Sequence, residues 1–459
     1  MFTLARVKPS RLLTVTVLLA LCLGLVDSIA RADHPSPDRY NPDRRLIERV
    51  EQLKTSTAAA GGQRAARSRN ISQIGFAPVP GFNGDVWAHN GFAYVGTWVF
   101  GPPDEGFPFC PATGVRIIDL SNRSNPTLVG AVAVIPGTTQ EDMVVTRIGT
   151  RFFHGDLLVT GIQDCFPGAP DGIDIWDVSN PRSPVHLAFW PSGAFGVHEL
   201  YLFQRGNRAY VTAATPFSEF VSDQGDFRLV DVTDPRHPVQ VGDWGLRDIG
   251  VEPTCENFEV FCTFAHSAWA NKTGTMAILS YWDFGAVFLD ISNPANPTFI
   301  GRTVYPAGAD GDTHSIWLAR GDNLLLTADE DFSPVFGPQP PAPDDTWGFL
   351  RVWDVKDPAN PVQIGTFGTP NSLSTRADAD FSIHNPFVRG NTAYLSWYAD
   401  GVRVIDISQP SAPREIASFV PPPVTDVIPF QEIWGVYVDR DLILASGFFG
   451  GLYVLKHVP

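Results

Sequence analysis

Histidine is the residue type in this chain whose placement suggests chemistry. The chain has ten histidines, and five of them stand just before or at the start of a short predicted strand in different copies of a repeat: His89, His198, His266, His314 and His384. Neutral imidazole nitrogens are good ligands for divalent transition metals. If the five strands line one axis, the sequence predicts a metal site where their imidazoles meet.

The elements that must position these histidines are built from one short phrase, which the chain contains six times. It reads GVRIIDLSNRSNP at Gly114–Pro126 and GVRVIDISQPSAP from Gly401. A period of 52 to 64 residues separates the repeated aspartates, which are Asp119, Asp177, Asp231, Asp290, Asp354 and Asp406. A period of this size predicts a stacked or radial repeat architecture.

Each repeat has the pattern of four short antiparallel strands. Apolar residues alternate along the phrase, and an Asp-x-Ser-Asn-Pro turn ends it, because Asn and Asp close local turns and Pro cannot donate to a ladder. A further strand follows, as in VQIGTF from Val362, and two strands precede the phrase. Repeated four-stranded units predict the blades of a β-propeller. The phrase resembles the LVIVD repeat of secreted bacterial and archaeal proteins over nearly all of Ile71–Val458, and the resemblance implies the fold without implying an activity.

The two ends of the repeat region complement each other. ISQIGFA at Ile71–Ala77 looks like the last strand of a blade whose other strands are missing, and the chain ends with three strands that lack a fourth. We therefore expect the first strand to complete the last blade and to close the ring, which removes exposed strand edges. The predicted fold is all-β, a seven-bladed β-propeller over residues 71–459.

The N-terminal residues have a different composition. Basic residues precede an apolar run at Leu12–Val26, and Ala30-Arg31-Ala32 offers a cleavage site, so residues 1–32 are interpreted as a secretory signal peptide. An apolar run of about 15 residues is short for a membrane-spanning helix. We expect an exported protein, periplasmic or extracellular, without a stable membrane anchor after cleavage. Residues 33–70 are expected to form a short helix and a flexible linker.

Four cysteines remain after removal of the signal peptide, and an even number in an exported protein suggests disulfides. Cys110 and Cys165 occupy the same loop in successive blades, and Cys255 and Cys262 bracket a short segment. We predict the pairs Cys110–Cys165 and Cys255–Cys262. A cysteine-based metal site is the weaker interpretation, because no close C-x-x-C spacing occurs.

A structural interpretation of the histidines competes with the metal site. In WD-repeat propellers, which the layout resembles only in architecture, a histidine before the first strand bonds an aspartate in the turn between the second and third strands. Asp226, Asp283 and Asp400 are placed to do this for His198, His266 and His384, respectively. In carotenoid oxygenases, also propellers, four histidines instead hold iron. The two interpretations differ in where the imidazoles point.

Other patterns narrow the function classes. A net charge of −16 and the lack of a Lys/Arg cluster exclude nucleic acid as a partner. No G-x-S-x-G elbow, P-loop or dinucleotide-binding loop occurs. Acidic loops such as Asp329-Glu330-Asp331 and Asp378 with Asp380 are interpreted as solvated carboxylates. The DGDTH stretch, with Asp310, Asp312 and His314, is the densest alternative cation site.

Two hypotheses from different classes follow. The first is an exported scaffold, expected to be monomeric, that binds a small-molecule, glycan or protein ligand on a propeller face built by its loops. The second is a metal-dependent enzyme, an oxidase or a lyase, with a divalent transition metal held by the five histidines at the central channel. The catalytic residues and the substrate stay open in both.

Overall fold

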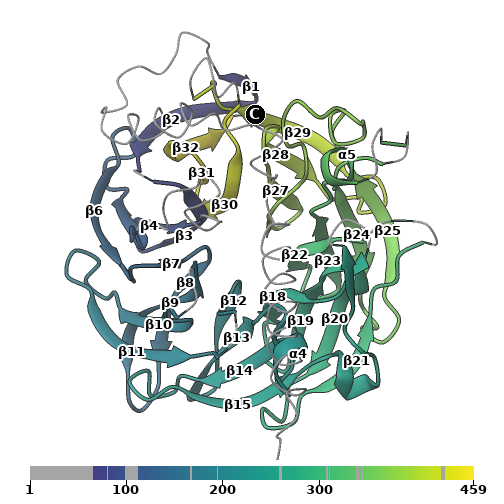
Figure 1. The fold of residues 1–459 in the computed structure, drawn as a ribbon. Helices are drawn as coiled ribbons and strands as arrows, with labels where there is room; N and C mark the ends of the chain where they lie inside the picture. Colours follow the sequence, from purple (N-terminus) through teal and green to yellow (C-terminus); the bar gives the residue numbers. More distant parts are fainter. Residues whose placement is uncertain are drawn as a thin grey trace, which may run out of the picture.

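The architecture is a closed ring of seven four-stranded blades (Figure 1). The structure is a computed structural model that describes residues 66–458 except 80, 99–111, 166–167, 194, 258–260, 307–308, 310, 338–340, 343–344 and 425–429. Residues 1–32, predicted as a signal peptide, and most of the predicted linker lie outside the described residues. Within the described part, no helix is long and apolar enough to cross a membrane.

We number the blades in chain order by their innermost strand, and we give the strands from the axis outward. Blade 1 contains β3 (Asn83–His89), β4 (Phe92–Thr97), β5 (Val115–Asp119) and β6 (Thr127–Val132), and blade 2 contains β8 (Met143–Gly149), β9 (His154–Asp164), β10 (Gly172–Asp177) and β11 (Val185–Pro191). Blade 3 contains β12 (Leu200–Arg205), β13 (Arg208–Ala214), β14 (Phe227–Asp231) and β15 (Val239–Trp244). Blade 4 contains β18 (Ala265–Ala270), β19 (Met276–Tyr281), β20 (Gly285–Asp290) and β21 (Thr298–Arg302).

Blades 5 to 7 follow the same order. Blade 5 contains β22 (Thr313–Ala319), β23 (Leu324–Asp329), β24 (Leu350–Asp354) and β25 (Val362–Phe367). Blade 6 contains β26 (Pro386–Arg389), β27 (Thr392–Trp397), β28 (Gly401–Asp406) and β29 (Arg414–Val420). Blade 7 contains β30 (Ile433–Asp439), β31 (Leu442–Gly447), β32 (Gly451–His457) and β2 (Ile71–Pro78). The minor elements are β1 (Arg67–Arg69), β7 (Thr138–Thr139), β16 (Cys255–Asn257), β17 (Phe261–Cys262), α4 (Ser218–Val221), α5 (Ser333–Phe336) and the 3-10 turns η2 (Leu246–Ile249) and η3 (Trp282–Phe284).

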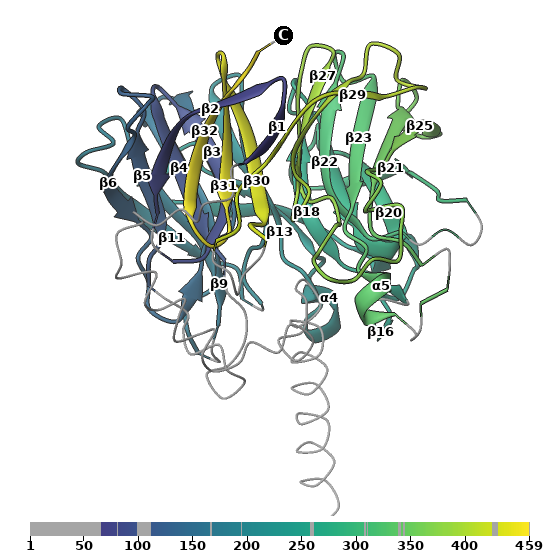
Figure 2. The same cartoon turned by 90° about the horizontal axis from the view of Figure 1, so that it is seen from above.

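The N-terminal strand closes the ring. β2 pairs antiparallel with β32, from Ile71 opposite His457 to Pro78 opposite Gly451, and it forms the outer edge of blade 7 (Figures 1 and 2). Just before it, β1 pairs with β29 and adds a fifth strand to blade 6. The folded part thus includes Arg67–Arg69, which the sequence assigned to the linker. The segment from β1 to β2 joins blades 6 and 7.

The repeated aspartate closes the same turn in six blades. In each copy the carboxylate accepts the backbone N–H two residues further on, at 2.7 to 3.1 Å, as in Asp119 with Ser121 and Asp406 with Ser408. This side-chain bond ends the third strand and sets the turn that leads to the fourth.

The turn of one blade packs against a glycine of the preceding blade. A Cβ atom placed on the glycine of the fourth strand would lie 2.0 to 2.5 Å from a turn carbonyl oxygen in four blades: Gly75 against Arg123, Gly242 against Pro294, Gly301 against Pro358, and Gly365 against Pro410. Only glycine allows an approach this close. The Gly75 contact joins blade 7 to blade 1, so the closure of the ring repeats the packing found between blades 3 and 4, 4 and 5, and 5 and 6.

Apolar side chains fill the spaces between blades. At the closure, Val86 and Val95 of blade 1 pack with Leu444 and Val454 of blade 7 in one buried cluster. Similar clusters join the other neighbouring blades, and the largest buried side chains are mainly tryptophans and tyrosines. The inner strands of all blades therefore face a common axis at fixed distances.

The glycine contact at the closure gives a first prediction. Gly75→Ala should lower the free energy of unfolding by about 1 to 3 kcal/mol, because the added methyl group overlaps the Arg123 carbonyl and forces blades 7 and 1 apart. Gly130→Ala is the matched control, since it changes the equivalent glycine of blade 1, where no atom lies within 4 Å of the added Cβ. Denaturant unfolding of both variants checks this, and an equal loss in both would contradict the packing argument.

Candidate metal centre

The four histidines of blades 3 to 6 stand at β-bulges next to the axis. In blade 4, Ala265 pairs with Tyr281 and Ser267 with Ser280, which leaves His266 as the extra residue. His314 is the extra residue between Thr313 and Ser315 in blade 5. A bulge turns a side chain out of the normal alternation of the strand. At these positions the local backbone presents the imidazoles to the axis.

His198 and His384 occupy the same type of bulge just before their inner strands. The carbonyl of Ala214 in blade 3 accepts the backbone N–H of His198, and the N–H of Ala214 donates to the carbonyl of Glu199. Two residues of one strand therefore lie opposite one residue of the next. Ser396 of blade 6 does the same with His384 and Asn385. We call His198, His266, His314 and His384 the imidazole cluster. All four side chains are at most 2% exposed.

The imidazole cluster forms a continuous row across four consecutive blades. The ring centroids of His198 and His266 lie 4.1 Å apart, those of His266 and His314 3.9 Å, and those of His314 and His384 4.3 Å. The Nε2 atoms of His198 and His266 approach to 2.7 Å. The sequence prediction that imidazoles from different blades converge thus describes the geometry of these four histidines.

His89, the fifth predicted residue, does not join the imidazole cluster. It ends β3 instead of beginning it, and its Nε2 lies 3.2 Å from Asp156 Oδ1 at the partly exposed end of the blade. Gly84 is the blade 1 residue at the bulge, and Glu141 is the blade 2 residue that lies against it. The side chain of Glu141 contacts an imidazole of the cluster, with its Oε2 3.2 Å from His198 Nδ1.

Three buried glutamates face the imidazole cluster. Glu141 Oε2 lies 3.2 Å from His198 Nδ1, and Glu199 Oε1 lies 3.8 Å from His266 Nδ1. Glu330 places one oxygen 3.5 Å from His314 Nε2 and the other 4.0 Å from His384 Nε2. Sequence reasoning missed Glu141 and Glu199, and it wrongly interpreted Glu330 as a solvated loop carboxylate, since Glu330 is 1% exposed.

Hydrogen bonds fix the orientation of these groups. Gln163 Oε1 lies 2.7 Å from Nδ1 of His198, close to Glu141, so Nδ1 carries the proton and Nε2 offers its lone pair toward His266. The indole N–H of Trp434 donates to Glu141 Oε1 at 2.7 Å, and the hydroxyl of Tyr398 donates to Glu330 Oε1. The carboxylates are therefore held toward the imidazoles by residues on their outer side.

The predicted histidine–aspartate pairs are replaced by other contacts. Asp226 accepts the backbone N–H groups of Glu219 and Ala265, and Asp400 accepts from Thr369 and Asn371. Asp283 accepts the backbone N–H of Cys262. These aspartates shape turns, while the imidazoles contact one another and the glutamates.

Burial decides the protonation of the site. It lowers the pKa of His266 to about 3, and burial together with the neighbouring imidazoles lowers the pKa of His314 well below 6.5. Burial, and then the nearby carboxylates of Asp142 and Asp85, raise the pKa of Glu199 well above 4.5. Both imidazoles are thus neutral at pH 7 and have lone pairs available for a cation.

Two groups of side chains are spaced to hold an ion. The ligand atoms of Glu199, His266 and His314 all lie within 4.8 Å of one another, and so do those of His314, Glu330 and His384. The two groups share His314. Together they bring nitrogens and carboxylate oxygens from blades 3 to 6 to one buried place on the axis.

Aromatic rings enclose the imidazole cluster. Trp98 lies 4.9 Å from His198, Trp282 5.5 Å from His266, and Trp434 4.6 Å from His384, measured between ring centroids. Because these rings are buried and apolar, they limit water around the imidazoles.

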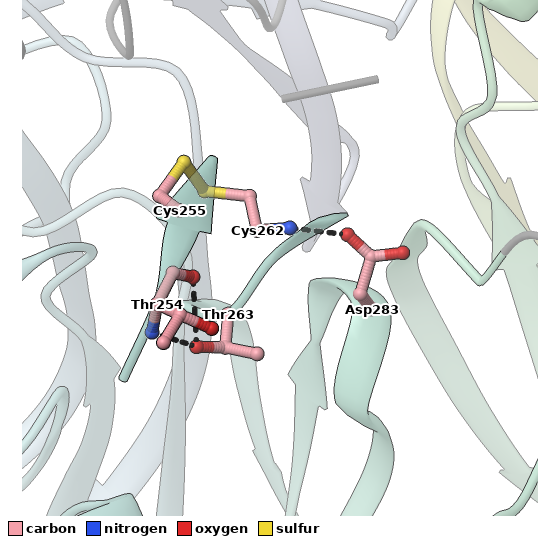
Figure 3. Close-up of a disulfide and its surroundings, with 5 residues drawn as sticks. All are labelled: Thr254, Cys255, Cys262, Thr263 and Asp283. Carbon is pink, nitrogen blue, oxygen red and sulfur yellow. Dashed lines mark hydrogen bonds between the residues drawn. A yellow bond between two sulfur atoms is a disulfide. The ribbon is translucent and has the colours of Figure 1, made fainter. Parts of the chain in front are cut away.

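A disulfide supports one of these rings. Cys255 and Cys262, which the sequence predicted to pair, are bonded across the β16–β17 hairpin with their Cα atoms 4.0 Å apart. The backbone N–H of Cys262 donates to Asp283 Oδ2 at 2.6 Å, which anchors the turn that carries Trp282 (Figure 3). Cys165 is also disulfide-bonded, and its predicted partner Cys110 lies outside the described residues.

A pH prediction follows from the carboxyl groups beside the site. Burial raises the pKa of Asp142 from 3.8 to about 7. The folded protein thus holds this proton where the unfolded chain has lost it, and the resulting stability, present below about pH 4, is lost as the pH rises to about 7. In metal-free protein, the thermal midpoint of the wild type should therefore fall relative to that of Asp142→Asn over this range.

Calorimetric scans of both proteins at several pH values measure this difference. Asp85 and Glu199 also have pKa values raised by burial and then by the carboxylate of Asp142, so Asp142→Asn lowers their pKa values and adds to the difference in the same direction. The Asn oxygen can still accept the Leu200 N–H that Asp142 accepts at 3.0 Å. Midpoints that run parallel across the pH range would contradict the assignment.

Comparison with known proteins agrees with the fold. The family model described as LVIVD repeat matches residues 112–134, 280–304 and 387–420. No curated protein is significantly similar to the chain in sequence. The structure is similar to the Myceliophteria thermophila Cps50 (Swd1) β-propeller domain, with a TM-score of 0.51 and 13% identity over 85% of this chain and 100% of that one.

It is also similar to Raptor from Chaetomium thermophilum, with a TM-score of 0.52 and 13% identity over 86% of this chain; the chain spans 30% of Raptor's length. At this identity the likeness concerns the fold alone. Propellers are in general binding scaffolds, because their loops vary while the strands hold them rigidly. The repeated phrase, the seven blades in a ring and the matching family model together identify the chain as an LVIVD-repeat β-propeller.

Proposed function

We propose that the protein is a metal-dependent enzyme in which His198, His266, His314 and His384 hold one divalent transition-metal ion on the propeller axis. The observation that carries this proposal is the convergence of buried imidazole nitrogens and glutamate oxygens in two overlapping groups, each within 4.8 Å, with His198 Nε2 2.7 Å from His266 Nε2 beside them. Metal–nitrogen bonds of about 2.1 Å place the ligands of one ion about 3 to 4 Å apart, so a small inward movement of the side chains completes a site.

The glutamates can orient the imidazoles of such a site as well as offer oxygens to the ion. A ligand histidine usually donates its other ring N–H to a carboxylate, which orients the imidazole and makes it a stronger ligand. Nδ1 of His198 donates to the amide oxygen of Gln163, with Glu141 Oε2 3.2 Å away, and Glu199 Oε1 lies 3.8 Å from Nδ1 of His266. A divalent cation would also offset the repulsion among the buried carboxylates.

The imidazole ligands and their surroundings favour oxidase chemistry over a lyase reaction. Imidazole suits iron, copper, nickel and zinc. The aromatic rings of Trp98, Trp282 and Trp434 lie against the imidazoles and keep water scarce, which disfavours hydration and elimination steps that exchange protons with solvent. The ion would supply redox chemistry when bound, and the chain would supply orientation and a dry environment.

Export is part of the proposal. The cleavage site and apolar run within residues 1–32 support a secretory signal peptide. The disulfide between Cys255 and Cys262 also supports it, since disulfides persist in oxidising compartments. We therefore place the mature protein in a periplasm or outside the cell.

Metal analysis tests the proposed function. The purified mature protein should hold about one transition-metal ion per chain, and the ion should be lost in the His266→Ala, His314→Ala double variant. His89→Ala is the matched control, because His89 lies outside the imidazole cluster and should leave the metal content unchanged. Elemental analysis with near-ultraviolet circular dichroism of each variant measures metal and fold together.

Removal of the metal gives a second readout. A chelated wild-type protein should unfold at a lower temperature than the loaded one, because an ion that binds only the folded state stabilises it by mass action. The double variant should not respond to the chelator. If the wild type stays metal-free after incubation with iron, copper, nickel and zinc in turn, the metal centre is refuted. The protein would then be better described as a binding scaffold without catalytic activity.

A further inference from the structure

Tyr398 is a buried phenol placed directly beside the imidazole cluster. It follows β27 in blade 6, is 2% exposed, and lies with its ring centroid 5.2 Å from that of His384. Its backbone φ of +23° is unusual for a bulky side chain. A backbone bridge to Ile433 of blade 7 holds this conformation, so the phenol is positioned by two blades.

The Tyr398 hydroxyl has a base as its partner. It donates to Glu330 Oε1, and the other oxygen of Glu330 lies 3.5 Å from His314 Nε2. The phenol, the carboxylate and the imidazoles therefore form one connected series in which every group is buried. Trp434, with its centroid 5.3 Å from that of Tyr398, covers the side toward blade 7.

A phenol that donates to a fixed carboxylate is prepared for oxidation. Removing an electron from a phenol makes its proton strongly acidic, so oxidation becomes easier when a base is already hydrogen-bonded to the hydroxyl. We propose that Tyr398 is a redox-active residue that gives one electron to the metal centre while its proton passes to Glu330. This inference rests on the proposed function, and it assigns Tyr398 a role in the chemistry of that site.

The oxidant in this step is a peroxide, which takes up both electrons. Hydrogen peroxide accepts two electrons and two protons, its O–O bond breaks, and it leaves as two waters. One electron would come from a bound ferrous ion, which would become ferric, and the other from Tyr398, which would become a neutral phenoxyl radical. One proton is the phenolic proton, which Glu330 accepts and passes on, and the second comes from solvent.

Tyr281 provides a matched control within the chain. It is also fully buried, and its hydroxyl donates to a glutamate, Glu219 Oε2, at 3.3 Å. Its ring packs against Trp244 and Phe284 in blades 3 and 4, away from the connected series that reaches the imidazoles. Both tyrosines are buried and both donate to a carboxylate. They differ because the carboxylate beside Tyr398, Glu330, also lies next to His314, whereas Glu219 is not part of that series.

The test uses the mature protein loaded with ferrous ion under anaerobic conditions. Hydrogen peroxide is added, the sample is frozen, and electron paramagnetic resonance is recorded. We expect a tyrosyl radical in the wild type, whose hyperfine splitting collapses when the protein contains ring-deuterated tyrosine. Tyr398→Phe should lose this radical, Tyr281→Phe should keep it, and Glu330→Gln should diminish it because the amide is a poor proton acceptor.

Iron content, measured on the same samples, distinguishes a failure of the role of Tyr398 from a failure of the metal centre itself. If all four proteins bind iron but the radical persists in Tyr398→Phe or disappears in Tyr281→Phe, Tyr398 is not the donor and the metal centre stands. If iron binds and no tyrosyl radical forms in the wild type, the redox role is also refuted. If the wild type binds no iron, the proposed function fails for this metal and the role of Tyr398 fails with it.

Discussion

The geometry of the imidazole cluster depends on how closely each blade packs against the next. The contact that sets this spacing is the turn carbonyl of one blade lying against a glycine of the preceding one, as at Gly242 and Gly301. A side chain at these positions would push the blades apart and spread their inner strands. Because the four imidazoles come from four consecutive blades, with centroids 3.9 to 4.3 Å apart, any change in blade spacing is felt directly at the axis.

The fold could be predicted from sequence because its signals are local and repeated. The aspartate that closes each turn and the alternation of apolar residues lie within a dozen residues of each other, and six copies reinforce the interpretation. The closure by Ile71–Ala77 was also accessible, since that segment matches the fourth strand of a repeat. The pairing of Arg67–Arg69 with β29 was not, because short polar segments carry no apolar pattern to reveal a strand.

The site was predicted only in part, for physical reasons. A bulge adds one residue to a strand, and the period of two cannot show where it falls; this is why His89 was grouped with the others and why Glu141 was missed. Glu330 lies in an acid-rich stretch that suggests solvent exposure. Its burial comes from His384 and Tyr398 in the next blade, which are 54 and 68 residues further along the chain.

The uneven use of the bulge position argues for function over scaffolding. A histidine needed only to stabilise a blade should recur in every blade, as the turn aspartate does in six. Instead, blades 3 to 6 carry the imidazoles, while blade 1 has Gly84 and blade 7 has Trp434 at the bulge. Burying neutral imidazoles beside carboxylates of raised pKa costs stability, and an ordinary apolar core would avoid that cost. A fold that accepts it on one side of its axis, and surrounds it with oriented hydrogen bonds, has the organisation expected of a site that binds a cation.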